Sequence, residues 1–177
     1  LKIMRDRQTL GHITTAVLNG IDPRLEAEKP DLVMVHGDTT TTFAAALASY
    51  YRMIPVAHVE AGLRTDNIYS PFPEEINRRL ADRLAEVYYA PTAAARAALL
   101  REGARPDHVL VTGNTVIDAL LVTAAGPAPE WEPKIARALE RPGPKVLVTV
   151  HRRESWGAPM ERVAQAIKQV SGQRPDV

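Results

Sequence analysis

Short runs of apolar, mostly β-branched residues alternate along the chain with longer stretches rich in alanine and leucine. The short runs lie at residues 31–35, 54–59, 87–90, 108–112 and 145–150. They are long enough for buried strands and too short for helices. The longer stretches, which predict helices, lie at residues 43–51, 74–86, 92–103, 116–122 and 159–170. Strands separated by helices predict parallel pairing with right-handed crossovers, because sequential parallel strands need a long return connection.

Two further features of the pattern indicate how the elements are grouped. The Val-rich runs lack the polar alternation of a half-exposed sheet, which predicts burial on both faces. Prolines and glycines flank Trp131 and a short predicted helix near residues 134–140, a composition that favours a connection between domains. We therefore predict an α/β fold of two doubly wound domains. The first covers residues 1–123, the linker 124–144, and the beginning of the second 145–177.

Both ends of the sequence have the character of internal segments. The chain begins at Leu1 rather than at methionine. Its last residues, 174–177 (RPDV), repeat the pattern of residues 29–33 (KPDLV), which introduces the strand predicted at 31–35. We expect the chain to be part of a longer protein, with both predicted domains incomplete.

Composition narrows the class of protein. Lys and Arg number 22 against 21 Asp and Glu, and the basic residues are scattered, so nucleic acid is not an expected partner. The absence of cysteine excludes disulfides and thiolate metal sites. No apolar run has the length of a membrane span, and no signal-peptide pattern is present. These features together favour a water-soluble, cytoplasmic protein.

Acidic and polar side chains follow the predicted strands directly. The residues at the strand ends are His36-Gly37-Asp38, His58-Val59-Glu60, Gly113-Asn114 and His151. In open α/β sheets ligands bind beyond the carboxyl ends of the strands, so we expect these side chains at one edge of the fold. Asp38 is also suited to capping a helix. Glu60 ends a strand that should be buried, where a carboxylate needs a partner or serves in a site.

Glu74 has a structural interpretation on spacing alone. It lies in the first turn of a predicted helix, where the macrodipole favours an acid, and Arg78 follows four residues later. Glu75 and Arg79 have the same spacing. One pair can face solvent while the other faces inward, and spacing does not decide which.

The histidines raise the question of a metal site. His36, His58 and His151 could join Asp38 and Glu60, but neither a His-x-x-x-His spacing nor a cysteine accompanies them. We therefore expect no metal.

An anion site is the stronger prediction for the segment that begins at His151. Arg152 and Arg153 follow it before a predicted helix, and guanidinium groups at a helix N-terminus suit a phosphate. The alternative is that both arginines are solvated and pair with Glu154. No Walker-type loop is present, and no G-x-G-x-x-G follows a strand.

Several of these segments together resemble the non-hydrolysing UDP-N-acetylglucosamine 2-epimerases. The matching blocks run in one order along essentially the whole chain: Val35–Thr42 (VHGDTTTT), His58–Thr65 (HVEAGLRT), Tyr69–Glu75 (YSPFPEE), Thr112–Leu120 (TGNTVIDAL) and His151–Ser155 (HRRES). The resemblance implies two Rossmann-like domains of the glycosyltransferase-B type, only partly present here, with substrate held between them. It also implies inversion at C2 of UDP-GlcNAc to give UDP-ManNAc, by elimination of UDP and its re-addition to 2-acetamidoglucal.

The resemblance gives the strand-end residues roles. Asp38, Glu60 and Glu74 match the family's catalytic carboxylates, so it overrides the structural interpretation of Glu74. His151 matches the histidine that contacts UDP, and Arg152 is assigned with it to substrate binding or, alternatively, to a regulatory site. Which acid removes the C2 proton stays open.

Further expectations follow from the same resemblance. Arg7 and Gln8 lie in a segment similar to the one that, in bacterial members, contacts a second UDP-GlcNAc acting as an allosteric activator. A homodimer is expected, and neither a metal nor a nicotinamide cofactor is required. The alternatives are a UDP-sugar glycosyltransferase of the same fold, a hydrolysing 2-epimerase that releases ManNAc, and a catalytically silent sugar-nucleotide sensor.

Overall fold

A computed structural model of the protein describes residues 1–5, 7–150 and 156–174. The chain divides into two compact units, Leu1–Ile117 and Asp118–Val177, which are described separately. No helix in the described ranges is both long enough and apolar enough to cross a membrane.

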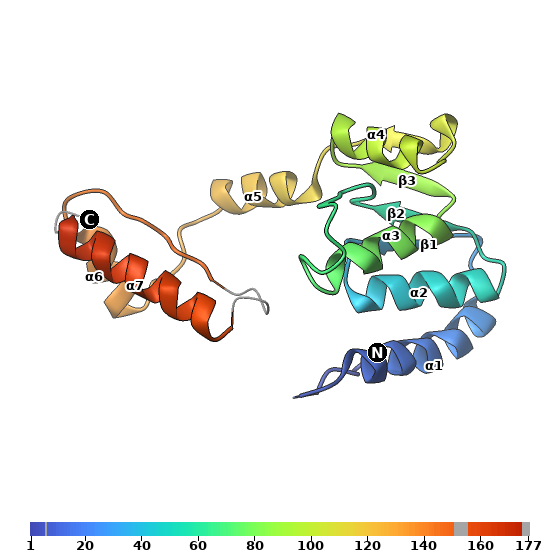
Figure 1. The fold of residues 1–177 in the computed structure, drawn as a ribbon, viewed down its shortest axis with the longest axis horizontal. Coiled ribbons are helices and arrows are strands. Elements are labelled where there is room, and N and C mark those ends of the chain that lie inside the picture. Colours follow the sequence, from blue (N-terminus) through green and yellow to red (C-terminus); the bar gives the residue numbers. More distant parts are fainter. Residues whose placement is uncertain (6, 151–155, 175–177) are drawn as a thin grey trace. The chain divides into compact units, whose positions relative to one another are not determined.

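The first unit is built on a parallel sheet with helices between its strands (Figure 1). The sheet has the order β1-β2-β3-β4, and each neighbouring pair is parallel, as the alternating pattern predicts. The strands are β1 (Val33–His36), β2 (Val56–Val59), β3 (Val87–Ala90) and β4 (Val109–Val111). The helices are α1 (Leu10–Glu28), α2 (Thr40–Tyr51), α3 (Glu74–Leu84) and α4 (Ala93–Arg101), with a short 3₁₀ turn, η1 (Pro106–His108), before β4.

Threonine hydroxyls begin three of these helices. Thr39 Oγ1 accepts a hydrogen bond from the Thr42 amide at the start of α2, and Thr92 Oγ1 accepts one from the Ala95 amide at the start of α4. Thr9 caps α1 in the same way. Each hydroxyl satisfies an amide that has no partner within its helix. The helix predicted at residues 92–103 is formed, with Thr92 as its cap.

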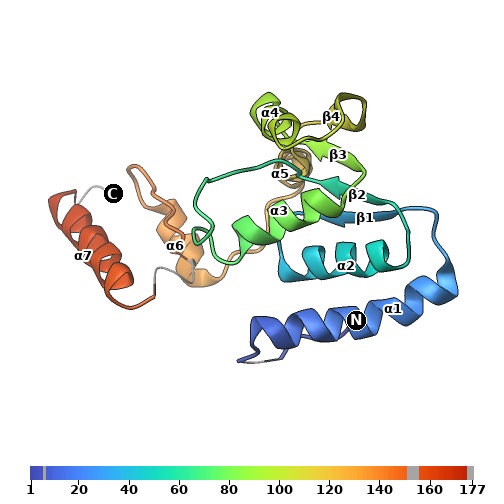
Figure 2. The same ribbon diagram turned by 45° about the vertical axis from the view of Figure 1, so that its right-hand side comes forward.

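The helices α2, α3 and α4 cover one face of the sheet. The residues Val35, His58, Tyr88 and Val109 are paired in register across the four strands, so their side chains lie on the same face. All four are buried. Helices α2 and α3 pack side by side over β1 and β2, α4 packs on β3 and β4, and α1 packs on α2 (Figure 2).

The prediction that the sheet is buried on both faces is wrong for the described part of the chain. On the face opposite to α2, Met34 is 59% exposed, and Leu110 is 48% exposed. Four strands in consecutive order, joined by right-handed crossovers, place all their connecting helices on one side of the sheet. Within the described residues, this face of the sheet is therefore not covered by the helices that connect the strands.

The second unit contains helices without a sheet in its described residues. Helix α5 (Thr115–Ala125) leads into α6 (Pro133–Glu140), and α7 (Ala158–Gln173) follows. The predicted helices near 134–140 and at 159–170 are confirmed. The predicted division into residues 1–123, 124–144 and 145–177 stays a prediction.

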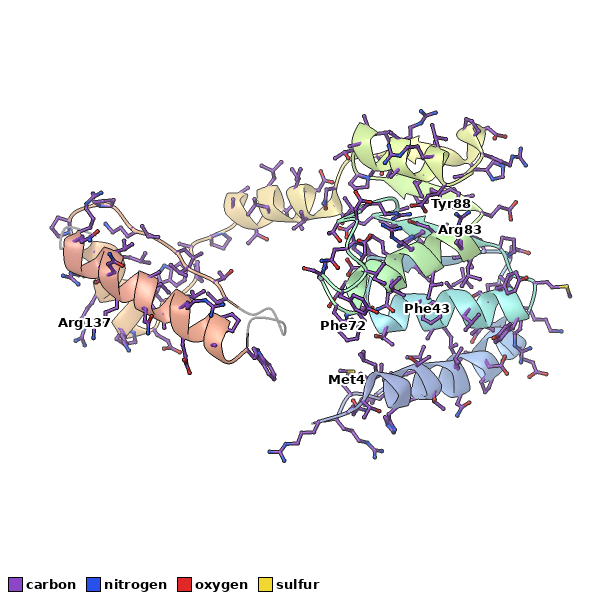
Figure 3. The ribbon with its side chains drawn as sticks, in the orientation of Figure 1. Met4, Phe43, Phe72, Arg83, Tyr88 and Arg137 are labelled. Atoms are coloured by element: carbon purple, nitrogen blue, oxygen red, sulfur yellow. The ribbon has the colours of Figure 1, made fainter. Side chains whose placement is uncertain are left out.

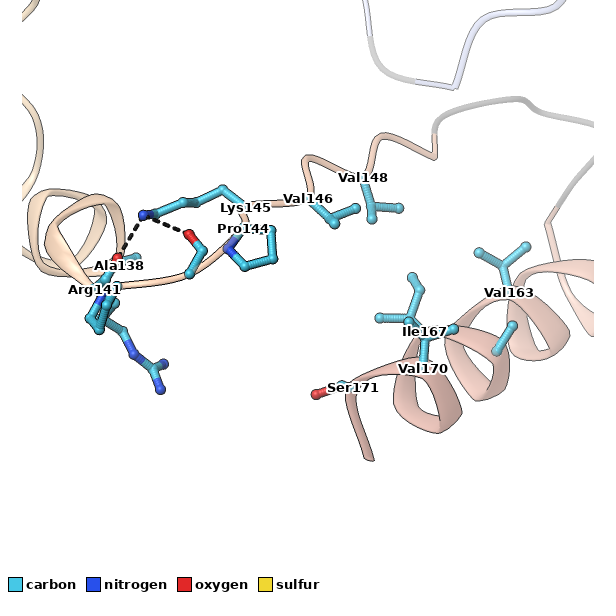
Figure 4. Close-up of a pocket in the computed structure, with 13 residues that line it drawn as sticks. Ala138, Arg141, Pro144, Lys145, Val146, Val148, Val163, Ile167, Val170 and Ser171 are labelled. Atoms are coloured by element: carbon cyan, nitrogen blue, oxygen red, sulfur yellow. Dashed lines mark hydrogen bonds between the residues drawn. The ribbon is translucent and has the colours of Figure 1, made fainter. Parts of the chain in front are cut away.

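The strand predicted at residues 145–150 is not formed. Its side chains are exposed, and Leu147 is 89% accessible. A strand needs a neighbour for its backbone hydrogen bonds, and the described part of this unit offers none. The segment instead runs beside α7 over an apolar hollow of about 960 Å³, with Lys145 Nζ donating to the carbonyl oxygens of Arg141 and Gly143 (Figure 4).

Candidate active site

The ends of β1 and β2 bring two predicted site residues together. His36 and Val59 are paired in register at the last position of each strand, so the residues that follow them leave the sheet side by side. The Gly37 amide donates to the Val59 carbonyl at 3.0 Å. Gly37 has a φ of 72°, and a Cβ built there would lie 3.8 Å from Glu60 Oε2. The Glu60 carboxylate therefore lies against the turn that carries Asp38.

Asp38 is held by α3 rather than used as a helix cap. Its Oδ2 accepts a hydrogen bond from Arg78 Nη2 at 2.9 Å, and its carbonyl oxygen accepts one from Asn77 Nδ2 at 3.0 Å. Because Thr39 caps α2, the capping interpretation of Asp38 is wrong. Its side chain keeps 33% of its surface accessible. A charge-assisted bond to an arginine fixes the carboxylate in one position.

Glu60 occupies a strained backbone conformation. Its φ is 66°, in the left-handed region that residues with a Cβ seldom adopt, at a cost on the order of 1–3 kcal/mol. The side chain is 24% exposed, and Oε1 lies 3.2 Å from His36 Nε2. The turn persists because its neighbours are fixed: the Ala61 amide donates to the Tyr89 carbonyl, and the Gly62 amide donates to Asp82. Strain at a strand end is typical of functional positions.

Glu74 is the first residue of α3 and is half-buried. Its side chain makes no hydrogen bond or ion pair with any residue that the structure describes. The pairing of Glu74 with Arg78 that the spacing permits is not formed, because Arg78 bonds Asp38 and faces Glu75 instead. Its carboxylate is therefore not engaged by a neighbouring cation within the described chain.

Glu75 takes the inward position that spacing left undecided. It is fully buried, and its Oε1 accepts from Arg79 Nε at 2.8 Å. Its Oε2 accepts from the Thr65 amide at 3.1 Å and lies 3.5 Å from Arg78 Nη1. Arg78 thus joins Glu75 to Asp38, and its own Nε is buried without a partner among the described residues. Sequence reasoning missed this bridging role of Arg78.

A second charge network lies beneath the two strand-end turns. Asp82 Oδ1 lies 2.6 Å from His58 Nδ1. Asp82 Oδ2 accepts from the Gly62 amide at 3.1 Å and lies 2.8 Å from Arg64 Nη2. Arg64 Nε donates to Glu102 at 2.8 Å. Asp82 and Glu102 line one pocket together with Arg83 and Tyr88, which are labelled in Figure 3.

The pKa values of this second network follow from burial and pairing. The hydrogen bond from Arg64 lowers the pKa of Glu102. Burial alone would lower the pKa of Arg64, but the bonds and charges of Glu102 and Asp82 raise it above its ordinary value. For Tyr88, burial raises the pKa of the phenol, and the charge of Asp82 adds to the effect. The pKa values of Glu102, Arg64 and Tyr88 are therefore shifted by burial and by the charged groups beside them.

The contacts of the other predicted site residues do not indicate a functional role. Asn114 Oδ1 accepts from the Val116 amide at 3.0 Å, which is a helix-start role. Arg7 is exposed, with a φ of 56°. Gln8 accepts from the Arg5 amide and donates to the Ile3 carbonyl, both at 2.7 Å. His151 and Arg152 lie outside the described residues.

The described residues do not form the histidine-based metal site that the sequence raised as a question. No group of three or more His, Asp or Glu side chains among these residues could hold a metal ion. His36 faces Glu60, whereas His58 is turned inward to Asp82. What the site does offer is carboxylates in different environments: Asp38 bound to an arginine, Glu60 beside a histidine, and Glu74 without a partner in the described chain. Such differences suit acid–base chemistry on a neutral carbon centre.

Comparison with known proteins gives this site a family. The profile of the UDP-N-acetylglucosamine 2-epimerase family matches residues 1–177. The UDP-N-acetylglucosamine 2-epimerase of Bacillus subtilis is 48% identical over 179 residues, covering 100% of this chain and 46% of the relative. The chain thus spans about half the length of the curated relatives it matches.

Solved structures agree in fold. The complex of S. aureus MnaA with UDP matches with a TM-score of 0.84 at 43% identity, over 97% of this chain and 46% of that one. The Methanocaldococcus jannaschii UDP-GlcNAc 2-epimerase in complex with UDP-GlcNAc and UDP matches with a TM-score of 0.84 at 34% identity, over 100% and 48%. The predicted α/β fold of the glycosyltransferase-B type, partly present in this chain, is confirmed. The chain belongs to the UDP-N-acetylglucosamine 2-epimerase family.

Proposed function

We propose that a complete protein containing this chain is a non-hydrolysing UDP-GlcNAc 2-epimerase, which interconverts UDP-GlcNAc and UDP-ManNAc by inversion at C2. The proposal is supported by the family match over residues 1–177 and by relatives solved with UDP-GlcNAc or UDP bound. The observation that carries it is the convergence of Asp38 and Glu60 at the ends of β1 and β2, with Asp38 tied to the helix that begins at Glu74.

The proposed reaction is an elimination followed by an addition. A carboxylate takes the proton from C2 while the C1–O bond to UDP breaks, and the electron pair leaves with UDP. The products of this step are UDP and 2-acetamidoglucal. In the second step a phosphate oxygen of UDP bonds to C1 again, and a proton is delivered to C2 on the opposite face.

This reaction needs proton-transfer groups on two faces of the sugar, which one carboxylate cannot supply. Asp38, Glu60 and Glu74 are the proposed catalytic acids and bases. Asp38, bonded to Arg78, is suited to accept hydrogen bonds from the substrate in a fixed position. Glu60, which lies beside His36, and Glu74, whose side chain bonds no described residue, are the better candidates for moving protons. Neither carboxylate is held by an arginine or a lysine among the described residues, so both are free to meet the substrate.

The departing UDP needs positive charge, and the proposed donors are His151 and Arg152. An imidazole and a guanidinium beside a helix N-terminus stabilise a leaving phosphate as its charge develops. The proposed steps use neither a metal nor a nicotinamide. Further proposals are that a second UDP-GlcNAc binds at Arg7 and Gln8 as an activator, that the protein is a homodimer, and that it acts in the cytoplasm.

Product analysis tests the proposed function. Incubation of the complete protein with UDP-GlcNAc, followed by proton and phosphorus NMR, should show UDP-ManNAc accumulating to a constant ratio with UDP-GlcNAc. The same ratio should be reached from UDP-ManNAc. Release of free ManNAc and UDP would instead identify a hydrolysing enzyme, sugar transfer to an acceptor would identify a glycosyltransferase, and binding without turnover a sensor.

A further inference from the structure

His58 is the one histidine of β2, and its imidazole is completely buried. Nδ1 lies 2.6 Å from Asp82 Oδ1, and Nε2 lies 2.7 Å from the Gly37 carbonyl oxygen. The carbonyl oxygen can only accept a hydrogen bond, so Nε2 must carry a hydrogen. The ring is therefore a donor toward the end of β1.

The neighbours of Asp82 indicate whether His58 or Asp82 carries the proton that lies between them. If the carboxyl carried it, the group would be neutral while facing Arg64 Nη2 at 2.8 Å and the Gly62 amide at 3.1 Å. Both neighbours favour a carboxylate. Asp82 is thus an acceptor, and both nitrogens of His58 carry hydrogen, which makes the ring an imidazolium.

This assignment balances the charges of the network, in which the side chains of His58, Arg64 and Asp82 are buried and that of Glu102 is 27% exposed. His58 and Arg64 supply two positive charges, and Asp82 and Glu102 supply two negative ones in direct contact with them. A buried ion without a partner is costly. Burial therefore favours a network in which every charge is paired with an opposite one. Removing the charge of any member leaves another unbalanced.

The network holds the backbone of both turns that carry the strand-end acids. His58 holds the carbonyl oxygen of Gly37, whose next residue is Asp38. Asp82 holds the amide of Gly62, two residues after Glu60. A Cβ at Gly62 would lie 2.3 Å from the Ala95 carbonyl oxygen, so this turn is also pressed against α4. One side-chain pair therefore fixes two turns that lie far apart in the sequence.

We propose that His58, as a buried imidazolium bridging Asp82 and the Gly37 carbonyl, is a positioning residue that sets the relative placement of the Asp38 and Glu60 carboxylates. This proposal rests on the proposed 2-epimerase function. His58 does not touch substrate, because none of its surface is accessible.

Two substitutions of His58 each remove one of its two hydrogen bonds, so the contribution of each bond can be measured separately. The amide nitrogen of Gln lies near the position of imidazole Nε2, so His58→Gln can keep the bond to Gly37 and lose the one to Asp82. The amide nitrogen of Asn lies near the position of Nδ1, so His58→Asn can keep the bond to Asp82 and lose the one to Gly37. Both variants are made in the complete protein, and each removes the same charge.

The readout is exchange of the C2 hydrogen of UDP-GlcNAc with solvent deuterium, with thermal unfolding as the measure of folding. His58→Asn should lower kcat by about 10²-fold with KM little changed, the effect of displacing a group by about 1 Å. His58→Gln should keep more activity than His58→Asn at a similar unfolding midpoint. Equal kcat in both variants and wild type, or losses that follow thermal stability alone, would overturn the positioning role.

A spectroscopic measurement decides the protonation state without relying on activity. Nitrogen-15 NMR of the histidine-labelled wild-type protein should show two slowly exchanging ring N–H signals that are absent from His58→Gln. Asp82→Asn should leave one, since an amide at this position donates to Nδ1. A single ring N–H in the wild type would refute the imidazolium even if neither His58 variant folds. Wild-type protein with both signals but no C2 exchange would refute the proposed function, and the positioning role with it, while the buried network would stand.

Discussion

Arg78 Nη2 lies 2.9 Å from Asp38 Oδ2, and the same guanidinium reaches Glu75 through Nη1 at 3.5 Å. One buried side chain of α3 therefore fixes a carboxylate at the end of β1 and a buried carboxylate in its own first turn. The planar fork of arginine can contact both acids at once, whereas a lysine ammonium on a flexible stem is a single point charge.

Replacing Arg78 with Lys should preserve the charge and lose this double contact. We expect kcat for C2 exchange to fall by about 10²-fold, because Asp38 is no longer held in one position. Steady-state kinetics of the complete protein measures the effect, and Arg101→Lys, at an exposed position of α4, is the matched control. Unchanged kcat in Arg78→Lys would show that Asp38 does not depend on this bond.

Substitution by Gln should mainly affect stability at Glu75 and mainly affect activity at the adjacent Glu74. Glu75 is fully buried between Arg79 and the Thr65 amide, so Glu75→Gln should destabilise the protein by roughly 3 kcal/mol. Glu74→Gln removes a carboxylate without a partner among the described residues and should leave the unfolding midpoint in place while abolishing C2 exchange. Thermal unfolding and exchange rates of the two variants check this. Equal stability of both would contradict the assigned environments.

Gly62 and Gly103 form a matched pair for the close approach of the Glu60 turn to α4. Both have positive φ, 84° and 93°, but a Cβ at Gly62 would lie 2.3 Å from the Ala95 carbonyl oxygen, whereas nothing lies within 4 Å at Gly103. Gly103→Ala should cost about 1 kcal/mol for the backbone conformation. Gly62→Ala should cost a further 1–3 kcal/mol for the collision. Chemical denaturation gives both values, and equal losses would argue against the packing.

Glu102 should make stability depend on pH at the acidic end. Its pKa is lowered by the hydrogen bond from Arg64, so the folded protein favours the carboxylate more than the unfolded chain does. The resulting stability is fully present above the unfolded pKa, about 4.3, and is lost as pH falls through the lower folded value. Between pH 5 and 3, Glu102→Gln should therefore lose less stability than the wild type. Parallel pH profiles of the unfolding midpoint would contradict this.

The sequence pattern predicted the strands and the convergence of Asp38 and Glu60 because both follow from simple rules. Buried parallel strands are short and β-branched, and their carboxyl ends meet at one edge. Helix α1 was not predicted, although Ile13, Val17 and Leu25 form its buried stripe, because Pro23 and two glycines interrupt the composition of a helix. The strand predicted at 145–150 was wrong since its pattern is satisfied only when neighbouring strands are present.

The contacts that hold the acids could not be predicted in the same way. Glu74 and Glu75 have identical spacing to an arginine, and only the packing of α3 on β2 decides which one is buried. His58 and Asp82 are 24 residues apart, and nothing local relates them. The left-handed conformation of Glu60 is also invisible in the sequence, because it is imposed by the contacts of Ala61 and Gly62 with other elements.

The central claim is that the carboxylates at this sheet edge move a proton at C2. It is tested most directly by incubating the complete protein with UDP-GlcNAc in deuterated water and following the C2 position by proton NMR. The wild type should form UDP-ManNAc carrying deuterium at C2, and Glu60→Gln should abolish the exchange at an unchanged unfolding midpoint. Product that retains protium at C2, or wild-type exchange rates in Glu60→Gln, would contradict the account.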